Sequence, residues 1–342
     1  MSKTIWLNLD STKPDEARAL FWRKIHLPLR LFRELPSLDF FEKKGWTLLK
    51  EPIPTGDEEK TVEMACKADA VISTWEPWNT KTLNQVKDKV KYIVRYGAGM
   101  DNIDIPAATE AGILVGNVPG ANSAAVAEVA LLHILNIGRR FSHCTEGCRN
   151  GIWPSTITGN ELDGKTVGLL GFGNIGKQLV RMMKGFDVKV LVYDAYFPDQ
   201  DDEKYGVTFV KDKEELFRES DILSLHVPFN EETKGMIDKN VFAMMKPTAY
   251  LINTCRGGVI NEEDLIQALK EGQIQGAGLD VLVQEPPEKD NPLLSMDNVS
   301  ITSHMGAASL ESEHRSQVII GDCIADFFAG NVPYNVKNKL EK

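Results

Sequence analysis

The second half of the chain alternates short apolar runs with longer segments that mix apolar and polar residues. Six apolar runs of four to six residues, each bounded by polar or turn residues, predict six strands. They span 166–170, 188–193, 222–225, 250–253, 276–279 and 299–302. Helical patterns at 213–219 and 262–271 lie in the gaps between them. Strands joined by helical crossovers are typical of a doubly wound parallel sheet of the Rossmann class, so the predicted fold is α/β.

The first hundred residues show a similar but less regular alternation. Apolar runs at 5–9, 70–73 and 90–94 predict strands. Parallel pairing of these strands needs helical crossovers, which the intervening segments are long enough to form.

Two segments predict long helices. The segment 122–140 is rich in Ala and Leu at mostly helical spacing, and either Asn122 or the serine that follows it can cap the helix. A helix of this length is suited to joining two lobes. The segment 310–329 predicts a second long helix that ends at Gly330, and the charged segment 331–342 predicts coil.

Length and charge restrict the class of protein. A chain of 342 residues predicts about two domains. The formal charge of −10 argues against non-specific binding to nucleic acid or to an anionic membrane, since both need an excess of Lys and Arg. The uncharged stretch 111–127 is interrupted by glycines and a proline, so it does not predict a membrane span.

The cysteines predict structural thiols. The five are scattered and form no C-x-x-C pair, so we expect no metal site. Cys144 and Cys148 can share a helix face but have no second pair of ligands nearby. The apolar run at the N-terminus is too short for a signal peptide and ends at Asp10, so the expected compartment is the cytoplasm.

A dinucleotide-binding motif follows the strand predicted at 166–170. It is G-F-G-N-I-G, with glycines at Gly171, Gly173 and Gly176. The first allows the tight turn, the second lets the backbone approach a pyrophosphate, and the third lets the helix pack closely. Asp194 lies at the end of the next strand, where a carboxylate accepts hydrogen bonds from the ribose hydroxyls of adenosine. The same charge would repel a 2′-phosphate, so NAD is expected in preference to NADP.

Three later segments carry chemically active side chains directly after predicted strands. They are 253–258 with Arg256, 278–287 with Glu285, and 302–309 with His304. The carboxyl ends of parallel strands meet at one edge of the sheet, where ligands bind. The pattern predicts an acid/base histidine oriented by a carboxylate, beside a cation for an anionic substrate.

These segments, together with 96–104, 116–120 and 226–228, resemble those of the NAD-dependent D-isomer-specific 2-hydroxyacid dehydrogenases, which include phosphoglycerate, lactate and glyoxylate/hydroxypyruvate enzymes. The resemblance covers nearly the whole chain. It implies two Rossmann-like domains, with the NAD-binding domain (119–306) inserted into a discontinuous substrate domain (1–118 and 307–342). It also implies hydride transfer between NAD(H) and a 2-oxo acid or D-2-hydroxy acid.

The resemblance assigns a role to each catalytic residue. His304 would donate a proton to the substrate carbonyl during reduction, and Glu285 would hold its other ring nitrogen. Arg256 would polarise the carbonyl oxygen and bind the substrate carboxylate, which the amides of Gly97, Ala98 and Gly99 would also bind. The residues expected at the cofactor are Gly171, Gly173, Asn174, Ile175, Gly176, Asp194, Val227, Pro228, Thr254, Cys255, Arg256, Asp280 and His304. Among these, Asp280 would accept from the nicotinamide carboxamide.

The remaining histidines and two aspartates have other expected roles. We expect a structural role beside the cofactor for His226. We expect ordinary surface or helix positions for His26, His133, His143 and His314. Asp101 and Asp104 are expected to cap and order their loop rather than to bind a metal.

The substrate side chain is the least specified part of the prediction. Trp75, Glu76, Tyr96 and Met305 are expected to reach the substrate. Trp75 and Glu76 stand where phosphoglycerate enzymes of the family show an Arg-containing stretch, which argues against a phosphorylated substrate. An uncharged, small or apolar 2-oxo acid is expected instead, such as pyruvate or a branched-chain or aromatic analogue.

Alternative functions remain open, and one assembly is expected. The alternatives are D-3-phosphoglycerate dehydrogenase, a formate- or phosphite-type dehydrogenase, and an NAD-responsive binding protein resembling the family's corepressors. The resemblance to corepressors lies in 133–136 with Arg139 and Arg140. A homodimer is expected through the NAD-binding domain, with the helix predicted at 122–140 and the Trp153–Pro154 segment at the interface.

Overall fold

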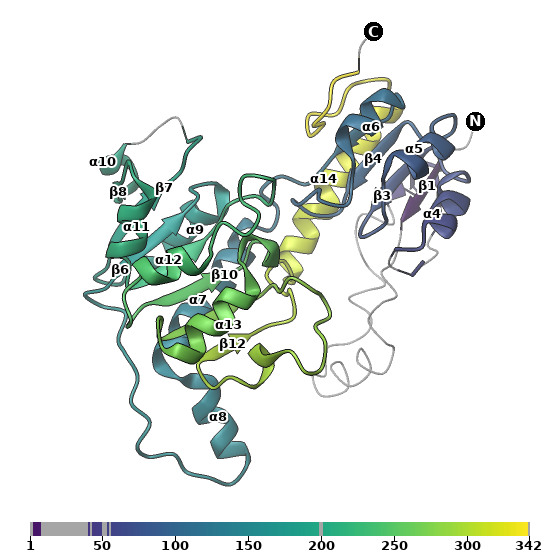
Figure 1. The fold of residues 1–342 in the computed structure, drawn as a ribbon. Helices are drawn as coiled ribbons and strands as arrows, with labels where there is room; N and C mark the ends of the chain where they lie inside the picture. The colour runs from purple at the N-terminus through teal and green to yellow at the C-terminus, as the bar shows by residue number, and fades with distance from the viewer. Residues whose placement is uncertain are drawn as a thin grey trace. The chain divides into compact units, whose positions relative to one another are not determined.

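The computed structural model describes residues 3–7, 40–41, 43–49, 53–54, 56–197 and 201–340. The chain divides into two compact units (Figure 1). Unit 1 comprises Met1–Asn122 and Ser309–Lys342, and unit 2 comprises Ser123–Ala308. Unit 2 is therefore inserted into the sequence of unit 1. Each unit contains one parallel sheet with helices packed on it, so the predicted α/β fold class is confirmed.

Unit 1 contains a five-stranded parallel sheet. Its strands are β1 (Thr4–Leu7), β2 (Thr47–Leu49), β3 (Ala70–Ser73), β4 (Tyr92–Arg95) and β5 (Leu114–Gly116), in the spatial order β2-β1-β3-β4-β5. Its helices are α4 (Glu58–Ala65), α5 (Thr80–Val86), α6 (Ile105–Glu110) and α14 (Leu310–Phe328). Alternate strand residues enter two cores, one with Trp6, Val71 and Ile93 and the other with Ile5 and Ile72. This alternation follows from the two-residue period of a strand whose sheet is covered on both faces.

The segment after α14 completes the edge of this sheet, although it forms coil as expected. Val336 forms an antiparallel bridge with Gly116. Buried Asn335 accepts a hydrogen bond from the Tyr92 hydroxyl at 2.7 Å and donates one to the Asn117 carbonyl at 2.6 Å. Buried Asn338 accepts from the Val115 amide at 2.8 Å. The tail thereby satisfies backbone groups that an open edge strand would leave unpaired.

Unit 2 contains a seven-stranded parallel sheet. Its strands are β6 (Thr166–Leu170), β7 (Lys189–Tyr193), β8 (Thr208–Phe209), β9 (Ile222–Leu225), β10 (Tyr250–Asn253), β11 (Gly276–Leu279) and β12 (Val299–Ile301), in the order β12-β11-β10-β9-β6-β7-β8. Its helices are α7 (Ser123–Arg139), α8 (Phe141–Arg149), α9 (Asn174–Met183), α10 (Asp202–Tyr205), α11 (Lys213–Glu219), α12 (Lys239–Met244), α13 (Glu262–Glu271) and the 3₁₀ turns η1 (Gly257–Val259) and η2 (Pro292–Ser295).

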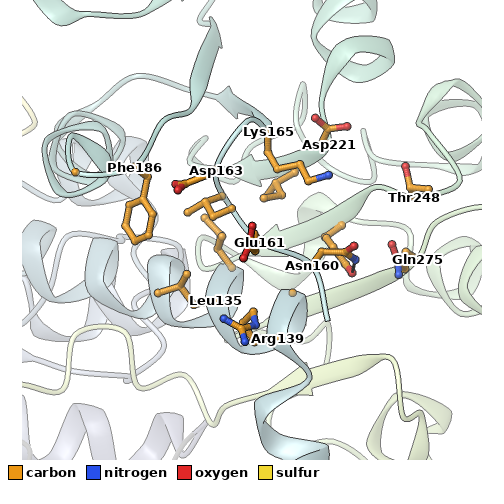
Figure 2. A pocket seen from close by; sticks show the side chains of 16 residues that line it. Leu135, Arg139, Asn160, Glu161, Asp163, Lys165, Phe186, Asp221, Thr248 and Gln275 are labelled. Carbon is orange, nitrogen blue, oxygen red and sulfur yellow. Dashed lines mark hydrogen bonds between the residues drawn. The ribbon is translucent and has the colours of Figure 1, made fainter. Parts of the chain in front are cut away.

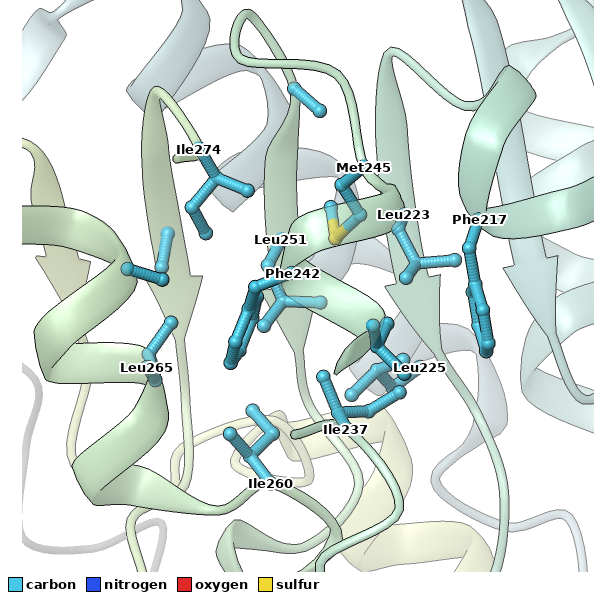
Figure 3. Packing of buried hydrophobic residues seen from close by; sticks show 14 of the residues in the cluster. Phe217, Leu223, Leu225, Ile237, Phe242, Met245, Leu251, Ile260, Leu265 and Ile274 are labelled. Carbon is cyan, nitrogen blue, oxygen red and sulfur yellow. The ribbon is translucent and has the colours of Figure 1, made fainter. Parts of the chain in front are cut away.

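Helices cover both faces of the unit 2 sheet. Leu223, Leu225 and Leu251 point toward the side of α11, α12 and α13 (Figure 3). Tyr250 and Ile252, the neighbours of Leu251 along β10, pack instead with residues of α7 and α9. Burial on both faces explains why the strands are continuous apolar runs rather than alternating apolar and polar ones.

Helix α7 approaches strand β11 closely. A Cβ atom at Gly278 would lie 2.7 Å from the Cβ of His133, and one at Gly276 would lie 3.3 Å from the Ile137 side chain. These two positions on β11 therefore need glycine for the helix to pack at its observed distance.

The prediction of secondary structure was confirmed for the regular segments. The bounds of β6, β9, β10, β11, α11 and α13 agree with those expected. Strands β2, β5 and β8, which have three, three and two residues, were not predicted. Strands this short carry too few residues to show a period of two. The predicted strand 5–9 is observed as Thr4–Leu7, and residues 8–9 and His26 lie outside the described residues.

None of the helices in the described part of the chain combines the length and apolarity needed to cross a bilayer.

Candidate active site

The glycine-rich turn joins β6 to α9 and leaves its backbone accessible. Gly171 has φ +98°, and a Cβ there would lie 2.6 Å from the His226 carbonyl oxygen. Gly173 is the N-cap of α9 without a side-chain hydrogen bond, and no heavy atom would lie within 4 Å of a Cβ there. Gly176 lies under the turn, with its Cβ position 3.0 Å from the Gly171 carbonyl oxygen. The turn thus presents helix N-terminal amides to an anion, as a dinucleotide pyrophosphate requires.

Asp194 follows β7 and lies against the same turn. Its Oδ2 accepts a hydrogen bond from the Phe172 amide at 2.7 Å, and its Oδ1 accepts one from the Tyr196 amide at 2.9 Å. These bonds hold the carboxylate beside the glycine-rich turn, as the spacing of the motif predicts. Each carboxylate oxygen can accept a further hydrogen bond, which suits ribose hydroxyls.

Two buried polar atoms at the carboxyl ends of β9 and β10 have no hydrogen-bond partner within the described residues. They are His226 Nδ1 and Thr254 Oγ1. The other ring nitrogen of His226 lies 3.0 Å from the Ser224 hydroxyl, and burial lowers the pKa of His226 to about 4. Buried polar groups are normally paired, so these two atoms fit contacts to a bound polar molecule. Together with the turn, they make this edge a fitting site for NAD.

Cys255 follows Thr254 and is held by Asn253. Asn253 Oδ1 accepts hydrogen bonds from both the amide and the thiol of Cys255, each at 3.0 Å. Burial raises the pKa of the Cys255 thiol to about 11, despite the nearby Arg256 charge. Val227 is partly buried against the neighbouring core, and Pro228 is exposed. The predicted cofactor residues of β9 and β10 thus lie at the carboxyl ends of adjacent strands.

His304 and Glu285 form a hydrogen-bonded pair in unit 2. His304 Nδ1 lies 2.7 Å from Glu285 Oε2, and Glu285 Oε1 accepts the Leu282 amide at 3.0 Å. Burial acts to raise the pKa of Glu285. The hydrogen bond and charge of His304 lower it, as do the Leu282 amide and the Arg256 charge, and together these outweigh burial. The pKa of Glu285 therefore lies below its ordinary value. Glu285 is therefore ionised at neutral pH and stabilises a protonated imidazole.

Arg256 stands between β10 and η1. Its Nη1 donates to the Cys255 carbonyl at 2.7 Å, and its own carbonyl accepts from the Asn253 amide group at 2.9 Å. A Cβ on the next residue, Gly257, would lie 2.0 Å from the Leu282 carbonyl carbon, so glycine allows the two loops to meet. In the sheet order β12-β11-β10, the strands preceding His304, Glu285 and Arg256 are neighbours. The structure therefore brings the three predicted catalytic residues to one edge of one sheet.

Asp280 is more enclosed than its expected role suggests. Its carboxylate is buried and accepts hydrogen bonds from the Thr302 hydroxyl at 2.5 Å, the Met305 amide at 2.9 Å and the Gly306 amide at 2.8 Å. Met305 is itself 39% exposed.

In unit 1, the loop that follows β4 contains Tyr96, Gly97, Ala98 and Gly99. Gly97 has φ +151°, and Ala98 accepts a hydrogen bond from Asn117 Nδ2 at 2.8 Å. Tyr96 is tied to β3 by its amide, which donates to the Ser73 carbonyl at 2.7 Å. Burial raises the pKa of Tyr96 to about 12, so its hydroxyl stays protonated.

The expectation that Glu76 reaches a substrate was wrong. Its side chain is buried and accepts hydrogen bonds from the Ser73 hydroxyl and the Thr74 amide, both at 2.7 Å. Glu76 therefore orders the loop from within. Trp75 is 42% exposed, and the guanidinium of Arg95 lies over its ring, 4.8 Å from the centroid.

A family model described as "D-isomer specific 2-hydroxyacid dehydrogenase, NAD binding domain" matches residues 131–306, which lie in unit 2. The chain belongs to the D-isomer specific 2-hydroxyacid dehydrogenase family. It is an NAD-dependent oxidoreductase of that family, as the glycine-rich turn and Asp194 indicate.

Two relatives and one solved structure illustrate the range of this dehydrogenase family. The chain is 37% identical to a glyoxylate reductase of Thermococcus litoralis, over 88% of this chain and 91% of the relative. It is 39% identical to a D-3-phosphoglycerate dehydrogenase of Methanocaldococcus jannaschii, over 82% of this chain but only 54% of the relative. The structure of a glyoxylate reductase from Paecilomyes thermophila superposes with a TM-score of 0.82 at 26% identity, covering 98% of each chain.

Two residues, one in each unit, were missed or misjudged from the sequence. Arg95 was missed, although an arginine that directly follows the apolar run 90–94 and precedes the glycine loop is a detectable signal. His133 was expected at an ordinary surface or helix position, but it is buried and bonded at both ring nitrogens. A single polar residue on the apolar face of α7 gives no sign of what lies opposite it. Asp104 does cap α6, as expected, by accepting from the Ala107 amide at 3.0 Å.

A cavity of about 600 Å³ lies at the opposite end of the unit 2 strands from the glycine-rich turn (Figure 2). Residues preceding β6, β9 and β10 line it, including Lys165, Asp221 and Thr248. This cavity therefore does not contain the dehydrogenase residues described above.

Proposed function

We propose that this dehydrogenase reduces a small, non-phosphorylated 2-oxo acid, such as glyoxylate or hydroxypyruvate, to the D-2-hydroxy acid. The observation that carries the proposal is the His304–Glu285 pair, at 2.7 Å, on the same sheet edge as Arg256 and the glycine-rich turn. The names of relatives from Thermococcus litoralis (glyoxylate reductase) and Thermotoga maritima (hydroxypyruvate reductase) support this substrate class.

The cofactor residues have distinct proposed roles. The amides at the start of α9, with Asn174 and Ile175, bind the pyrophosphate, and Asp194 binds the ribose hydroxyls. Val227, Pro228, Thr254 and Cys255 contact the nicotinamide half, and Asp280 accepts from its carboxamide through Oδ2, which accepts one protein hydrogen bond. When bound, NADH supplies the hydride that the carbonyl carbon of the substrate accepts.

Arg256, His304 and Glu285 stabilise the developing charge and supply the proton to the carbonyl oxygen. Negative charge develops on the carbonyl oxygen during reduction, and the Arg256 guanidinium stabilises it. His304 donates the proton from Nε2, because its Nδ1 is held by Glu285. Glu285 remains a carboxylate throughout and keeps the ring oriented, in the manner of a catalytic dyad.

Unit 1 is proposed as the substrate domain, with domain boundaries near 118 and 307. The amides of Gly97, Ala98 and Gly99 in this unit bind the substrate carboxylate. Tyr96 and Trp75 contact the substrate side chain. The Asn117–Ala98 hydrogen bond at 2.8 Å supports a preorganised loop.

The test is NADH oxidation with a panel of 2-oxo acids. Glyoxylate and hydroxypyruvate should be reduced with a kcat/KM above that for pyruvate and branched-chain 2-oxo acids. Tight NADH binding without turnover of any 2-oxo acid would contradict the proposal and support the NAD-responsive binding protein.

A second candidate is D-3-phosphoglycerate dehydrogenase. Arg95 supports it, because this cation beside the glycine loop could bind a phosphate, and so does the relative at 39% identity. This candidate would be favoured over the first if the protein oxidises D-3-phosphoglycerate faster than D-glycerate. The activity should then be lost in R95Q but kept in R149Q, a control on α8.

The chain is also proposed to form a cytoplasmic homodimer through α7, α8 and the segment after α8. The exposed apolar residues Phe141, Ile152 and Trp153, the last 84% exposed, support such an interface. The five unpaired cysteines support a reducing compartment. Light scattering should give a dimer mass for the wild type and a monomer mass for F141K/W153K.

A further inference from the structure

His133 lies within unit 2 on α7, away from the reacting groups proposed above, yet its surroundings are built around its ring. The side chain is buried, and both ring nitrogens have hydrogen-bond partners. Gly278 on β11 leaves the space that the histidine occupies, since a Cβ there would lie 3.1 Å from His133 Cγ.

A chain of hydrogen bonds runs through the two ring nitrogens of His133, and Asp280 is at one end of it. Its carboxylate accepts hydrogen bonds and cannot donate, so the Thr302 hydroxyl, 2.5 Å from Oδ1, donates a hydrogen bond to Asp280. The Thr302 oxygen then accepts from His133 Nε2, at 2.9 Å. His133 must therefore carry its proton on Nε2.

The other end of this chain of hydrogen bonds is at the start of α8. The Ser142 amide, which can only donate, bonds to Asn136 Oδ1 at 2.9 Å. Asn136 Nδ2 therefore faces Ser300 and donates to its hydroxyl oxygen at 2.6 Å. The Ser300 proton then points to His133 Nδ1, at 3.1 Å. All the bonds run in one direction, from Ser142 to Asp280.

The charge state of His133 agrees with this direction. Burial lowers the pKa of His133, and the charge of Asp280 opposes this effect only in part. A neutral imidazole has one donor and one acceptor nitrogen, which is what the two neighbouring hydroxyls require.

Asp280 in turn holds the segment that contains His304. Its carboxylate accepts from the Met305 and Gly306 amides, and its carbonyl accepts from the His304 amide at 2.7 Å. His304 has φ +53°, in the left-handed region that non-glycine residues adopt at a cost. Firm anchors on both sides are what keep such a residue in that conformation.

We propose that His133 is a positioning residue, a neutral imidazole with its proton on Nε2 that fixes Thr302 and Asp280 and, through them, the backbone of His304. The inference rests on the proposed catalytic role of His304. It concerns a residue on a helix that touches neither the substrate nor the cofactor in the function proposed above.

The first test compares substitutions at Thr302. T302V has the shape of threonine but cannot donate, and it should lower kcat about 10-fold. T302S retains the hydroxyl and should keep kcat within about 2-fold of the wild type. H133L should lower kcat to a similar degree, and H133L/T302V should be no worse than either single variant. Additive losses, or equal losses in T302S and T302V, would overturn the proposal.

The matched control is I137V, which removes one buried methyl group from the same helix face. It should lower the urea concentration at the midpoint of unfolding without changing kcat, which separates a general loss of packing from loss of the directed chain of hydrogen bonds.

The second test does not depend on turnover. In protein labelled with ¹⁵N-histidine, the His133 signals are those that disappear in H133L, and they should report a neutral ring protonated on Nε2 at pH 7. A ring protonated on Nδ1, or a charged ring, would overturn the proposal. If no 2-oxo acid is reduced but this tautomer is found, the proposed function fails while the chain to Asp280 stands.

Discussion

His304 Nδ1 and Glu285 Oε2 lie 2.7 Å apart, although 19 positions separate the two residues in the sequence. Their side chains are only 27% and 35% exposed, so the pair is partly withdrawn from water. This hydrogen bond orients the His304 ring through Nδ1, and the first two predictions depend on it.

Replacing His304 should abolish catalysis without abolishing cofactor binding. H304Q should lower kcat by about 10²–10⁴-fold, because the proton donor is lost. Its Kd for NADH, measured by fluorescence titration, should stay within about 3-fold of the wild type. H314Q, at an exposed histidine on α14, is the control and should leave both values unchanged. Activity of H304Q near that of the wild type would refute the assignment.

Replacing Glu285 should have a smaller effect that depends on pH. E285Q keeps the shape but loses the charge that stabilises the imidazolium, so kcat for reduction should fall about 10–100-fold at pH 7. Because the pKa of Glu285 is lowered, its charge is present at neutral pH and is lost only as the pH falls through the folded-state pKa. The wild-type rate should therefore exceed the E285Q rate by a constant factor from pH 7 to 5, and the two rates should converge only below pH 4.5, the ordinary glutamate value. A difference that disappears by pH 6 would contradict this interpretation.

Asp194 should determine the choice of cofactor. The wild type should use NADH with a kcat/KM at least about 100-fold above that for NADPH, because the carboxylate repels the 2′-phosphate. D194A should lose most of this preference, mainly through weaker NADH binding. E203Q removes a surface carboxylate on α10 and serves as the control. Comparable use of both cofactors by the wild type would rule out the predicted role.

The partly buried His226, which follows β9, should make stability depend on pH. The pKa of His226 is about 4 in the folded state against about 6.5 when unfolded, so the unfolded chain binds the proton first. The stability that this residue contributes is complete above pH 6.5 and is lost as the pH falls toward 4. Between pH 7 and pH 5, the free energy of unfolding measured with urea should fall by about 1–2 kcal/mol more for the wild type than for H226Q. H314Q should behave like the wild type.

The tail that follows α14 should stabilise unit 1. N335A removes a partner from the Tyr92 hydroxyl and the Asn117 carbonyl, and should lower the free energy of unfolding by about 1–3 kcal/mol. It should also raise the KM for the 2-oxo acid, since Asn117 supports the loop at Ala98. N331A, at an exposed position of the same tail, should change neither quantity. Unchanged stability of N335A would show that the tail is not part of the folded unit.

The regular parts of the fold could be predicted from the sequence because both faces of each sheet are covered. Strands such as β9 and β10 are therefore continuous apolar runs with polar flanks. The positions of Arg256 and His304 could be predicted because each follows such a run at the carboxyl end of a strand. Glu285 could be placed by the same motif, a few residues further along its loop.

Other features could not be predicted, because they depend on contacts between distant segments. Glu76 is directed inward by Ser73 and Thr74, and nothing in its neighbours' identity distinguishes that from an outward orientation. His133 meets Ser300 and Thr302 more than 160 positions later, across a space that Gly278 provides. The pairing of Tyr92 with Asn335 spans 243 positions.

The return of the chain to unit 1 has a consequence for how the protein forms during translation. At about 5–20 residues per second, the segment that forms unit 2 takes on the order of 10 s to synthesise, and α14 with its tail follows only then. Throughout that interval β5 lacks the Val336 bridge and the contacts of Asn335 and Asn338, because these residues have not yet been synthesised. The dinucleotide-binding unit is therefore fully synthesised before the other unit can complete its sheet, so the folding of unit 1 has to wait for a segment made after unit 2.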